Sequence, residues 1–277
     1  MSENVNMSNR GLDHVKNIIS IVSGKGGVGK SSITTNLAVS LAQRGLKVGI
    51  ADVDINGPSV AAMMSIPSDQ AAAGVEVEDG LLLSPFTSPH SGVAVASMGS
   101  FVQPGTPLMW RGPMLGSATK QLLTQVAWDD LDYLLLDSPP GTSDIMMVVN
   151  DSAQLNGGIV VTTPQRVAWD DASRSIEMLR QLKVPVLGVV DNMASFECPK
   201  CGHNEDIFGD SSLIEQAASE EDFDILAKIP LIRQIRDAGD AGKPVVLSDK
   251  RMQELFGELA ERVIERTNLG LLGVLRD

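Results

Sequence analysis

Gly24-Lys25-Gly26-Gly27-Val28-Gly29-Lys30-Ser31 is the stretch that decides the fold of this chain of 277 residues. An apolar, β-branched run precedes it at 17–23, and a run with apolar residues spaced by four follows it at 31–44. This order predicts a strand, a glycine loop and a helix. Glycines let backbone N–H groups turn toward phosphate oxygens, and the helix N-terminus adds about half a positive charge. The stretch therefore predicts a phosphate site, because a glycine cluster that only makes a tight turn would not need the final Gly-Lys-Ser triplet.

Three side chains of this loop carry the predicted chemistry. We expect Lys30 to reach the β- and γ-phosphates, and Ser31 to place its hydroxyl on the magnesium ion that bridges them. Lys25 is a second lysine that an ordinary loop of this kind lacks. It should point away from its own loop, where an ammonium group is useful if it meets developing negative charge. A solvated lysine beside an anion site is the alternative for Lys25.

Acidic residues follow two further predicted strands. Asp52 and Asp54 come after one strand, and Asp137 follows another in the sequence Asp-Ser-Pro-Pro-Gly-Thr. Ligands of open parallel sheets bind at the carboxyl ends of the strands. We expect Asp137 to orient magnesium, Asp54 to position the attacking water, and Gly141 to pivot when the γ-phosphate leaves. A helix cap for Asp137 and an exposed loop acid for Asp54 are the alternatives, and for Asp52 a ligand role and a structural role stay open.

The rest of the chain alternates predicted strands and helices. Strands are expected at 17–23, 47–51, 132–136, 158–162, 185–190 and 223–229, and helices at 31–44, from 143 onward, and at 167–182, 211–218 and 250–266. This alternation favours an α/β fold with a doubly wound, mostly parallel sheet. We expect a flexible polar segment at 1–17 and a single P-loop ATPase domain at 18–277, with 70–80 as a surface excursion.

Composition limits the partners and the compartment. The 22 Lys and Arg against 35 Asp and Glu give a net charge of −13, so general attraction to nucleic acid or to an anionic membrane is not expected. Segment 1–17 lacks the apolar core of a signal peptide, and no apolar run is long enough to span a bilayer. Two cysteines in a chain of this length argue against a disulfide framework and favour a reducing cytoplasm.

Both cysteines lie in one motif, Cys198-Pro199-Lys200-Cys201-Gly202-His203, within a predicted loop at 191–210. Two thiolates fill half of a zinc or iron-sulfur coordination shell, so the remaining ligands must come from elsewhere. His203 is one candidate, and a symmetric dimer that contributes two cysteines from each chain is another. A redox dithiol, half a zinc knuckle and an accidental pair are further explanations of Cys198 and Cys201.

With these motifs assembled, the chain resembles the Mrp family of nucleotide-binding iron-sulfur carriers, within the wider group of MinD, ParA and the nitrogenase iron protein. Lys25 in the glycine loop is the mark of the wider group. The resemblance covers nearly all residues after about position 15. The Mrp branch is indicated by Met-Trp-Arg-Gly-Pro-Met at 109–114, Leu-Asp-Tyr at 131–133 leading to Asp137, Asn-Met at 192–193 and the cysteine motif.

The resemblance implies a function and a set of site residues. Lys25 would cross to the ATP of the partner in a sandwich homodimer, Asn192 would read the adenine edge, and the cysteines would bind a labile 4Fe-4S cluster between subunits for transfer to apo iron-sulfur proteins. The implied nucleotide site comprises Gly24, Lys25, Gly26, Gly27, Val28, Gly29, Lys30, Ser31, Ser32, Gly141 and Asn192. Magnesium is assigned to Ser31, the cluster to Cys198 and Cys201, and catalysis to Lys25, Lys30, Asp54 and Asp137. Trp110 and Arg111 match the family motif without a physical role.

Two other functions compete with this one. A positioning ATPase of the MinD or ParA type would need a membrane-seeking tail or a basic patch, and the tail at 268–277 has one basic residue, Arg276. An ATPase in which the cysteines hold a structural zinc bridge is equally compatible with four thiolates. The family resemblance also has two departures: segment 1–17 has no cysteine, so a second cluster is not expected, and the small N-terminal domain of many bacterial members is not seen.

Overall fold

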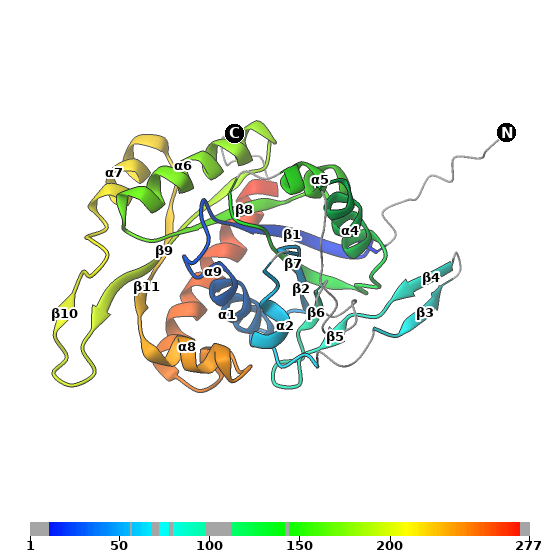
Figure 1. Ribbon diagram of the computed structural model, residues 1–277, viewed down its shortest axis with the longest axis horizontal. Helices are drawn as coiled ribbons and strands as arrows, with labels where there is room; N and C mark the ends of the chain where they lie inside the picture. The colour runs from blue at the N-terminus through cyan, green and yellow to red at the C-terminus, as the bar shows by residue number, and fades with distance from the viewer. Residues whose placement is uncertain are drawn as a thin grey trace.

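The chain forms an α/β structure with helices on both sides of a central sheet (Figure 1). A computed structural model describes residues 11–55, 57–67, 72–77, 80–97, 112–141 and 144–271. The strands are β1 (Val15–Val22), β2 (Val48–Asp52), β3 (Gly74–Val77), β4 (Gly80–Leu83), β5 (Phe86–Thr87), β6 (Ala94–Ser97), β7 (Leu131–Asp137), β8 (Gly157–Thr162), β9 (Val186–Glu197), β10 (Asn204–Glu205) and β11 (Ile225–Leu231). The helices are α1 (Lys30–Ala42), α2 (Val60–Met63), α4 (Gly112–Thr124), α5 (Asp144–Ser152), α6 (Arg166–Gln181), α7 (Ser212–Glu221), α8 (Arg233–Asp240) and α9 (Lys250–Leu271), with a short 3-10 turn, η1, at Val245–Leu247.

The sheet is mostly parallel, as the sequence predicts. Within the described residues its order is β10-β9-β8-β1-β7-β2-β6-β5, with β11 paired to β9. Antiparallel pairing occurs where β5 joins β6 and where β10 joins β9. From β1 the chain moves to one side for β2 and β6, and to the other side for β8 and β9. The crevice at the carboxyl end of β1 is therefore the topological switch point, where such sheets bind ligands.

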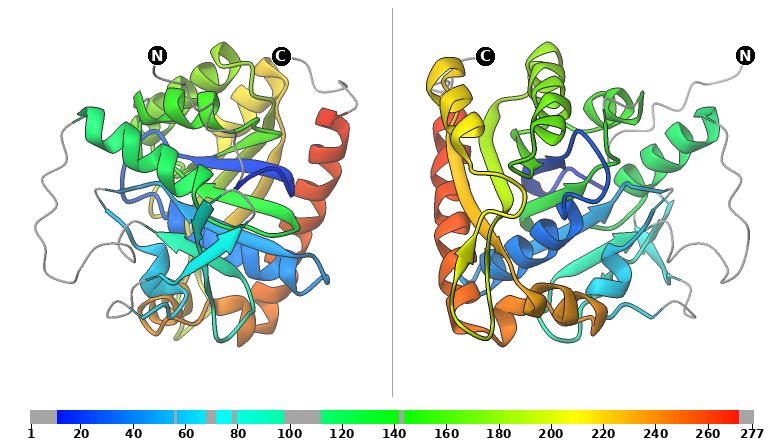
Figure 2. Two further views of the ribbon diagram at one scale, coloured as in Figure 1. Left: turned by 90° about the vertical axis from the view of Figure 1, so that its right-hand side faces the viewer. Right: turned by 60° about the vertical axis from the view of Figure 1, so that its left-hand side comes forward.

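Two apolar cores lie on opposite faces of the sheet. Along β7, Leu134 and Leu136 belong to one core and Leu135 to the other, because successive side chains of a strand point to opposite faces. Figures 1 and 2 show α4, α5, α6 and α7 on one side of the sheet and α1, α2, α8 and α9 on the other. A strand covered on both faces is apolar at consecutive positions, which explains why β7 could be recognised as a continuous run.

Several elements depart from the sequence prediction. The strand predicted to end at 190 is β9, which continues to Glu197 because its distal part pairs with β11 and β10. The predicted loop at 191–210 is thus wrong in its first part, and the cysteines lie at the tip of a β-hairpin. The buried polar residues Asp191 and Asn192 interrupted the apolar pattern and hid this extension.

The predicted flexible segment at 1–17 also needs correction where the structure describes it. β1 begins at Val15, and residues 11–14 form a turn in which Leu12 is buried. Residues 1–10 lie outside the described residues, as do Trp110 and Arg111 of the family motif. Part of the surface excursion at 70–80 belongs to the β3–β4 hairpin. Among the described residues, no helix combines the length and apolar character needed to cross a bilayer.

Candidate functional site

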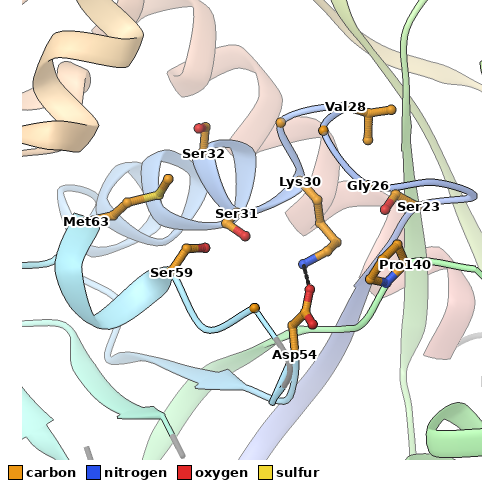
Figure 3. A pocket seen from close by; sticks show the side chains of 13 residues that line it. Ser23, Gly26, Val28, Lys30, Ser31, Ser32, Asp54, Ser59, Met63 and Pro140 are labelled. Atoms are coloured by element: carbon orange, nitrogen blue, oxygen red, sulfur yellow. Dashed lines mark ion pairs between the residues drawn. The ribbon is translucent and has the colours of Figure 1, made fainter. Parts of the chain in front are cut away.

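Three segments surround a cavity of about 240 Å³ at the carboxyl end of the sheet (Figure 3). They are the glycine loop after β1, the loop between β2 and α2, and the turn after β7. These segments meet because β7 lies between β1 and β2. The cavity is lined by Ser23, Gly26, Gly27, Val28, Gly29, Lys30, Ser31, Ser32, Asp54, Gly57, Ser59, Met63 and Pro140. The structure therefore brings residues 26–32 and Asp54 together around one space.

The buried ammonium group of Lys30 lies in this cavity. Its Nζ is 2.7 Å from Asp137 Oδ2 and 3.9 Å from Asp54 Oδ2, and Figure 3 shows the second ion pair. Neither contact has hydrogen-bond geometry, and Nζ has no hydrogen-bond partner among the described residues. An ammonium group that is buried without such a partner is unusual. Its N–H groups are available to oxygens of an anionic ligand in the cavity.

Asp137 is fully buried and contacts Lys30 and Ser31, which line the cavity. Its Oδ2 accepts a hydrogen bond of 2.6 Å from Ser31 Oγ, and its Oδ1 accepts one of 2.7 Å from Thr34 Oγ1. Ser31 and Thr34 lie three residues apart on α1 and therefore share a helix face. The Ser31 hydroxyl and the Asp137 carboxylate are thus in direct contact, and both are hard oxygen groups of the kind that magnesium prefers.

Asp52 anchors the loop between β2 and α2. It is fully buried at the end of β2, where it pairs in register with Asp137 of β7. Its carboxylate accepts hydrogen bonds from the backbone N–H groups of Asp54, Ser59 and Val60 at 3.2–3.3 Å. Burial, and then the neighbouring charge of Asp137, raise the pKa of Asp52 to about 7. For Asp52, which the sequence left open, this geometry favours a structural role.

Asp54 is partly exposed and lines the cavity itself. Burial raises the pKa of its carboxyl group, and the nearby Lys30 ammonium opposes that rise. The two acids therefore differ in role. Asp52 is buried at the end of β2 and accepts hydrogen bonds from the backbone of the loop, whereas Asp54 faces the space that a ligand would fill.

The side chain of Lys25 points away from the cavity that residues 26–32 of the glycine loop line. Its Nζ donates a hydrogen bond of 3.3 Å to Gln165 Oε1, directly before α6, and Lys25 does not line the cavity. This is the orientation expected from the sequence. Contact between Lys25 and a nucleotide on another chain stays a prediction.

Glycine is required at particular points of the loop for steric reasons. Gly29 has a left-handed backbone with φ of 87°, and a Cβ atom there would lie 2.2 Å from Asn192 Nδ2. A Cβ atom on Gly24 would lie 2.2 Å from the backbone carbonyl carbon of Asp171 in α6. Gly141 also has a left-handed backbone, and its N–H donates a hydrogen bond of 2.7 Å to Ser23 O. The turn after β7 is thereby fastened to the start of the glycine loop.

A second cavity of about 190 Å³ adjoins the first and shares Gly29, Ser32 and Met63 with it. Its other lining residues are Asn192, Met193, Pro230, Leu231, Ile232, Ile235, Arg236, Gly239 and Asp240. Asn192 is buried, and its Nδ2 donates a hydrogen bond of 2.7 Å to Val28 O in the glycine loop. Apolar walls with a few polar groups are typical of sites for flat organic ligands, so the two cavities together have the chemistry for a base joined to phosphates.

The residues present fit a nucleotide with magnesium. The Lys30 ammonium and the glycine loop suit phosphate oxygens. Among the described residues, no side-chain or more distant backbone atom lies within 4 Å of a Cβ built on Gly26 or Gly27, so the backbone there is open. Ser31 and Asp54 line the cavity with oxygen groups that suit a hard divalent cation, and Asp137 lies behind Ser31.

The cysteines lie apart from this site, at the tip of the β9–β10 hairpin, which extends to the lower left in Figure 1. The turn is closed by two backbone hydrogen bonds, Cys198 N to His203 O at 2.8 Å and Gly202 N to Cys198 O at 2.9 Å. Cys198 is partly exposed and Cys201 is exposed. Within the described residues, no group of three or more His, Cys, Asp or Glu side chains could hold a metal ion.

Backbone amides surround the sulfur of Cys198. Hydrogen bonds from the N–H of Lys200, then from the N–H and thiol of Cys201, lower the pKa of the Cys198 thiol. Hydrogen bonds to the charged form of a group favour that form. The turn therefore favours a thiolate, the form of cysteine that binds metals.

Several contributors to the site were not predicted from the sequence. The contact of Thr34 with Asp137 could have been predicted, because Thr34 lies three residues after Ser31 and so shares its face of the helix. Met63 and the residues of the second cavity between 230 and 240 come from segments without a motif, and only the folded structure places them at the cavities. The same holds for Gln165, which contacts Lys25 outside the cavities.

Comparison with known proteins shows which family this chain is similar to. Residues 14–264 match the model of the NUBPL iron-transfer P-loop NTPases, within the ParA group. An iron-sulfur cluster carrier protein from Pseudomonas fragi is 44% identical over 239 residues, which cover 86% of this chain and 81% of that protein. The mouse iron-sulfur cluster transfer protein NUBPL is 41% identical over 259 residues, which cover 92% of this chain and 79% of that protein.

Solved structures agree with the fold. A nucleotide-binding protein from Archaeoglobus fulgidus in complex with ADP has a TM-score of 0.74 and 33% identity, with 89% of this chain and 94% of that chain covered. The cell division ATPase MinD from Pyrococcus furiosus has a TM-score of 0.67 and 24% identity, with 90% and 99% covered, and this likeness concerns the fold alone.

Proposed function

Because this chain belongs to the family of NUBPL iron-transfer P-loop NTPases, we propose that it is an ATP-hydrolysing carrier that binds a labile 4Fe-4S cluster and transfers it to apoproteins. The main support for this proposal is that β9 runs from the glycine loop to the cysteine pair. Asn192, in the middle of that strand, contacts the glycine loop, and Cys198 directly follows its end. One strand thus joins the proposed nucleotide site to the proposed cluster site.

The nucleotide half of the proposal rests on charges and donors within one chain. Lys30 would bind the β- and γ-phosphates through its ammonium group, which lies between Asp137 and Asp54 and has no hydrogen-bond partner in the part of the chain that the structure describes. Ser31, with Asp137 behind it, would hold magnesium, which would neutralise phosphate charge. Asp54 would orient the attacking water at the open side of the cavity. Lys25 would stabilise charge on the nucleotide of a second chain.

The cluster half of the proposal requires two chains. Each chain offers Cys198 and Cys201 at an exposed hairpin tip, whereas a 4Fe-4S cluster takes four thiolates. Two hairpins related by a twofold axis would supply the full set, so we propose a homodimer formed through the nucleotide face and the cysteine hairpins. Recipients would be apo iron-sulfur proteins whose own thiolates replace the cysteines.

Anaerobic reconstitution tests this function. The full chain is reduced, loaded with iron and sulfide, and followed by visible absorbance, by iron, sulfide and zinc analysis, and by activation of an apo 4Fe-4S protein with and without MgATP. We expect a brown, oxygen-sensitive protein whose cluster moves to the acceptor. Cys198→Ser is the control and should stay colourless.

The same measurements address the competing functions. A colourless protein with one zinc per two chains would replace the carrier with a structural zinc bridge. Sedimentation with liposomes or DNA in the presence of MgATP would support a positioning ATPase if the protein co-sediments. The reducing cytoplasm indicated by the cysteine content stays a prediction.

A further inference from the structure

Beyond Asp191, strand β9 changes its pairing. In the parallel register Asp191 is the last residue that pairs with β8, opposite Thr162. On the other side Asn192 pairs with Ile229 of β11, and the next pair joins Phe196 to Leu231. Three residues of β9, 193–195, therefore face a single residue of β11, which is Pro230. Proline has no N–H group to donate, so this stretch of β9 lacks regular ladder bonds to β11.

Met193 begins this bulge in a strained conformation. Its φ is 57°, in the left-handed region that non-glycine residues rarely occupy. Such conformations persist where the surrounding structure enforces them, and they cluster at functional sites. Here the enforcing contacts come from the nucleotide side: Asn192 is bonded to Val28 O, and Met193 lines the second cavity beside Gly29.

The segment that returns from the hairpin is attached next to the point where the hairpin begins. After β10 the chain reaches Ser211, whose hydroxyl donates to Asp191 Oδ2 directly before α7. Asp191 Oδ1 is buried without a hydrogen-bond partner among the described residues. The hairpin from Asn192 to Asp210 is thus closed at its base, with one end on the glycine loop and the other on Asp191. The chain from Asn192 to Cys198 could span at most about 20 Å, at 3.3 Å per residue for an extended chain.

We propose that Met193 is a hinge through which a nucleotide in the second cavity sets the position of the cysteine hairpin, and that the Asp191–Ser211 hydrogen bond holds the returning end. This inference rests on the proposed function, because it takes the occupant of the cavity to be a nucleotide base. A base that fills the cavity contacts the Met193 side chain and changes the contacts that enforce its left-handed backbone. The unpaired bulge then absorbs the change in dihedral angles, and the hairpin tip moves with it.

The two cysteines of the chain provide a probe that needs no label. Both lie in the hairpin, so the reaction rate of the reduced, cluster-free chain with Ellman's reagent reports on the hairpin alone. The rate is measured with and without a non-hydrolysable ATP analogue in a Lys25→Ala background. This background removes the proposed contact between two chains and leaves the coupling within one chain. We expect the analogue to change the rate by about fivefold, the lower end of typical coupling between two sites.

Two variants locate the coupling. Met193→Gly keeps access to the left-handed backbone without strain and removes the side chain that lines the cavity, so the analogue should leave the thiol rate nearly unchanged. Ser211→Ala frees the returning end without touching either cavity, and it should at least halve the response to the analogue. Ser212→Ala is the matched control, because that neighbouring hydroxyl bonds to Asp210 instead of Asp191, and it should keep the full response.

The possible outcomes separate this inference from the function. Binding of a fluorescent ATP analogue is measured for every variant, and circular dichroism checks that each one folds. If the analogue binds the Lys25→Ala chain but leaves the thiol rate unchanged, the hinge is wrong while the carrier function stands. An equal response in Met193→Gly, Ser211→Ala and Ser212→Ala would also overturn the hinge. Failure of the parent chain to bind any ATP analogue would instead refute the proposed function.

Discussion

The nucleotide cavity and the cysteine hairpin differ in how complete they are within one chain. Around the cavity, Lys30 and Asp137 are buried, and side chains from the start of α1, the end of β7 and the loop after β2 already contact one another. At the hairpin tip, Cys201 is exposed, and the turn is held by backbone hydrogen bonds. The first site is preorganised by the sheet, whereas the second offers a partial set of ligands to solvent.

This difference indicates which partner each site requires. A preorganised cavity can bind a small molecule without help, because its groups need little reorganisation. A pair of exposed thiols needs further ligands from another chain before it can hold a cluster firmly. Substitutions at the two sites should therefore have separable effects. Two experiments test this separation, and two more test the contacts that preorganise the cavity.

Substitution of one hairpin cysteine should have the largest effect. Cys201→Ser would leave one thiolate per chain, so we expect complete loss of the visible absorbance after reconstitution. ATP binding, measured with a fluorescent analogue, should stay within about twofold of the wild type, because the hairpin tip lies outside both cavities. If Cys201→Ser lost ATP binding together with the cluster, the two sites would not be separable.

The reverse experiment removes the lysine of the cavity. Lys30→Ala should weaken ATP binding by about 100-fold, because charge-assisted hydrogen bonds to phosphate contribute about 1.5–3 kcal/mol. Cluster loading without nucleotide should persist. Lys16→Ala is the matched control: it also removes a lysine paired with an aspartate, Asp132, but at an exposed site remote from the cavity. Nearly equal affinities in the two variants would contradict the assignment of Lys30.

Two glycines of the same loop provide a sharper comparison. A Cβ on Gly24 would meet the backbone of α6 at 2.2 Å, whereas a Cβ on Gly26 would have no such neighbour within 4 Å among the described residues. We expect Gly24→Ala to lower the free energy of unfolding by about 2 kcal/mol through overpacking, and Gly26→Ala to change it by less than about 0.5 kcal/mol. Urea unfolding of both variants without ligand checks this, and similar stabilities would mean that the loop can move away from α6.

The pH dependence of stability tests the anchoring acid of the cavity. The folded-state pKa of Asp52, about 7, is above its ordinary value of 3.8. The contribution of this group to stability is therefore fully present below about pH 4 and is lost as the pH rises through about 7.

Asp52→Asn should remove this dependence. The fall in the free energy of unfolding between pH 5 and pH 7 should become shallower by up to about 1.4 kcal/mol per pH unit, which is the slope for one proton. The raised pKa of Asp191, about 6, acts in the same direction in both proteins and cancels in the difference. Parallel curves from urea titrations at several pH values would show that Asp52 does not titrate in this range.

The sequence predicted the cavity better than the hairpin for physical reasons. The glycine loop, Asp54 and Asp137 are tied to strand ends, and the topology of a parallel sheet brings strand ends together. The extension of β9 to Glu197 depends on pairing with β10 and β11, which no local pattern records. Of the residues that line the second cavity, the sequence predicted Gly29, Ser32 and Asn192, but not the opposite wall, which is built from α8 and the residues before it.

The exposure of Cys201 has a consequence for kinetics. If a cluster is held at this tip, an acceptor thiolate can approach iron from solvent while the hairpin stays folded. Delivery would then proceed by associative ligand exchange, and its rate would rise in proportion to acceptor concentration. A buried pair of cysteines would instead release its cargo at the rate of a local opening, whatever the amount of acceptor present.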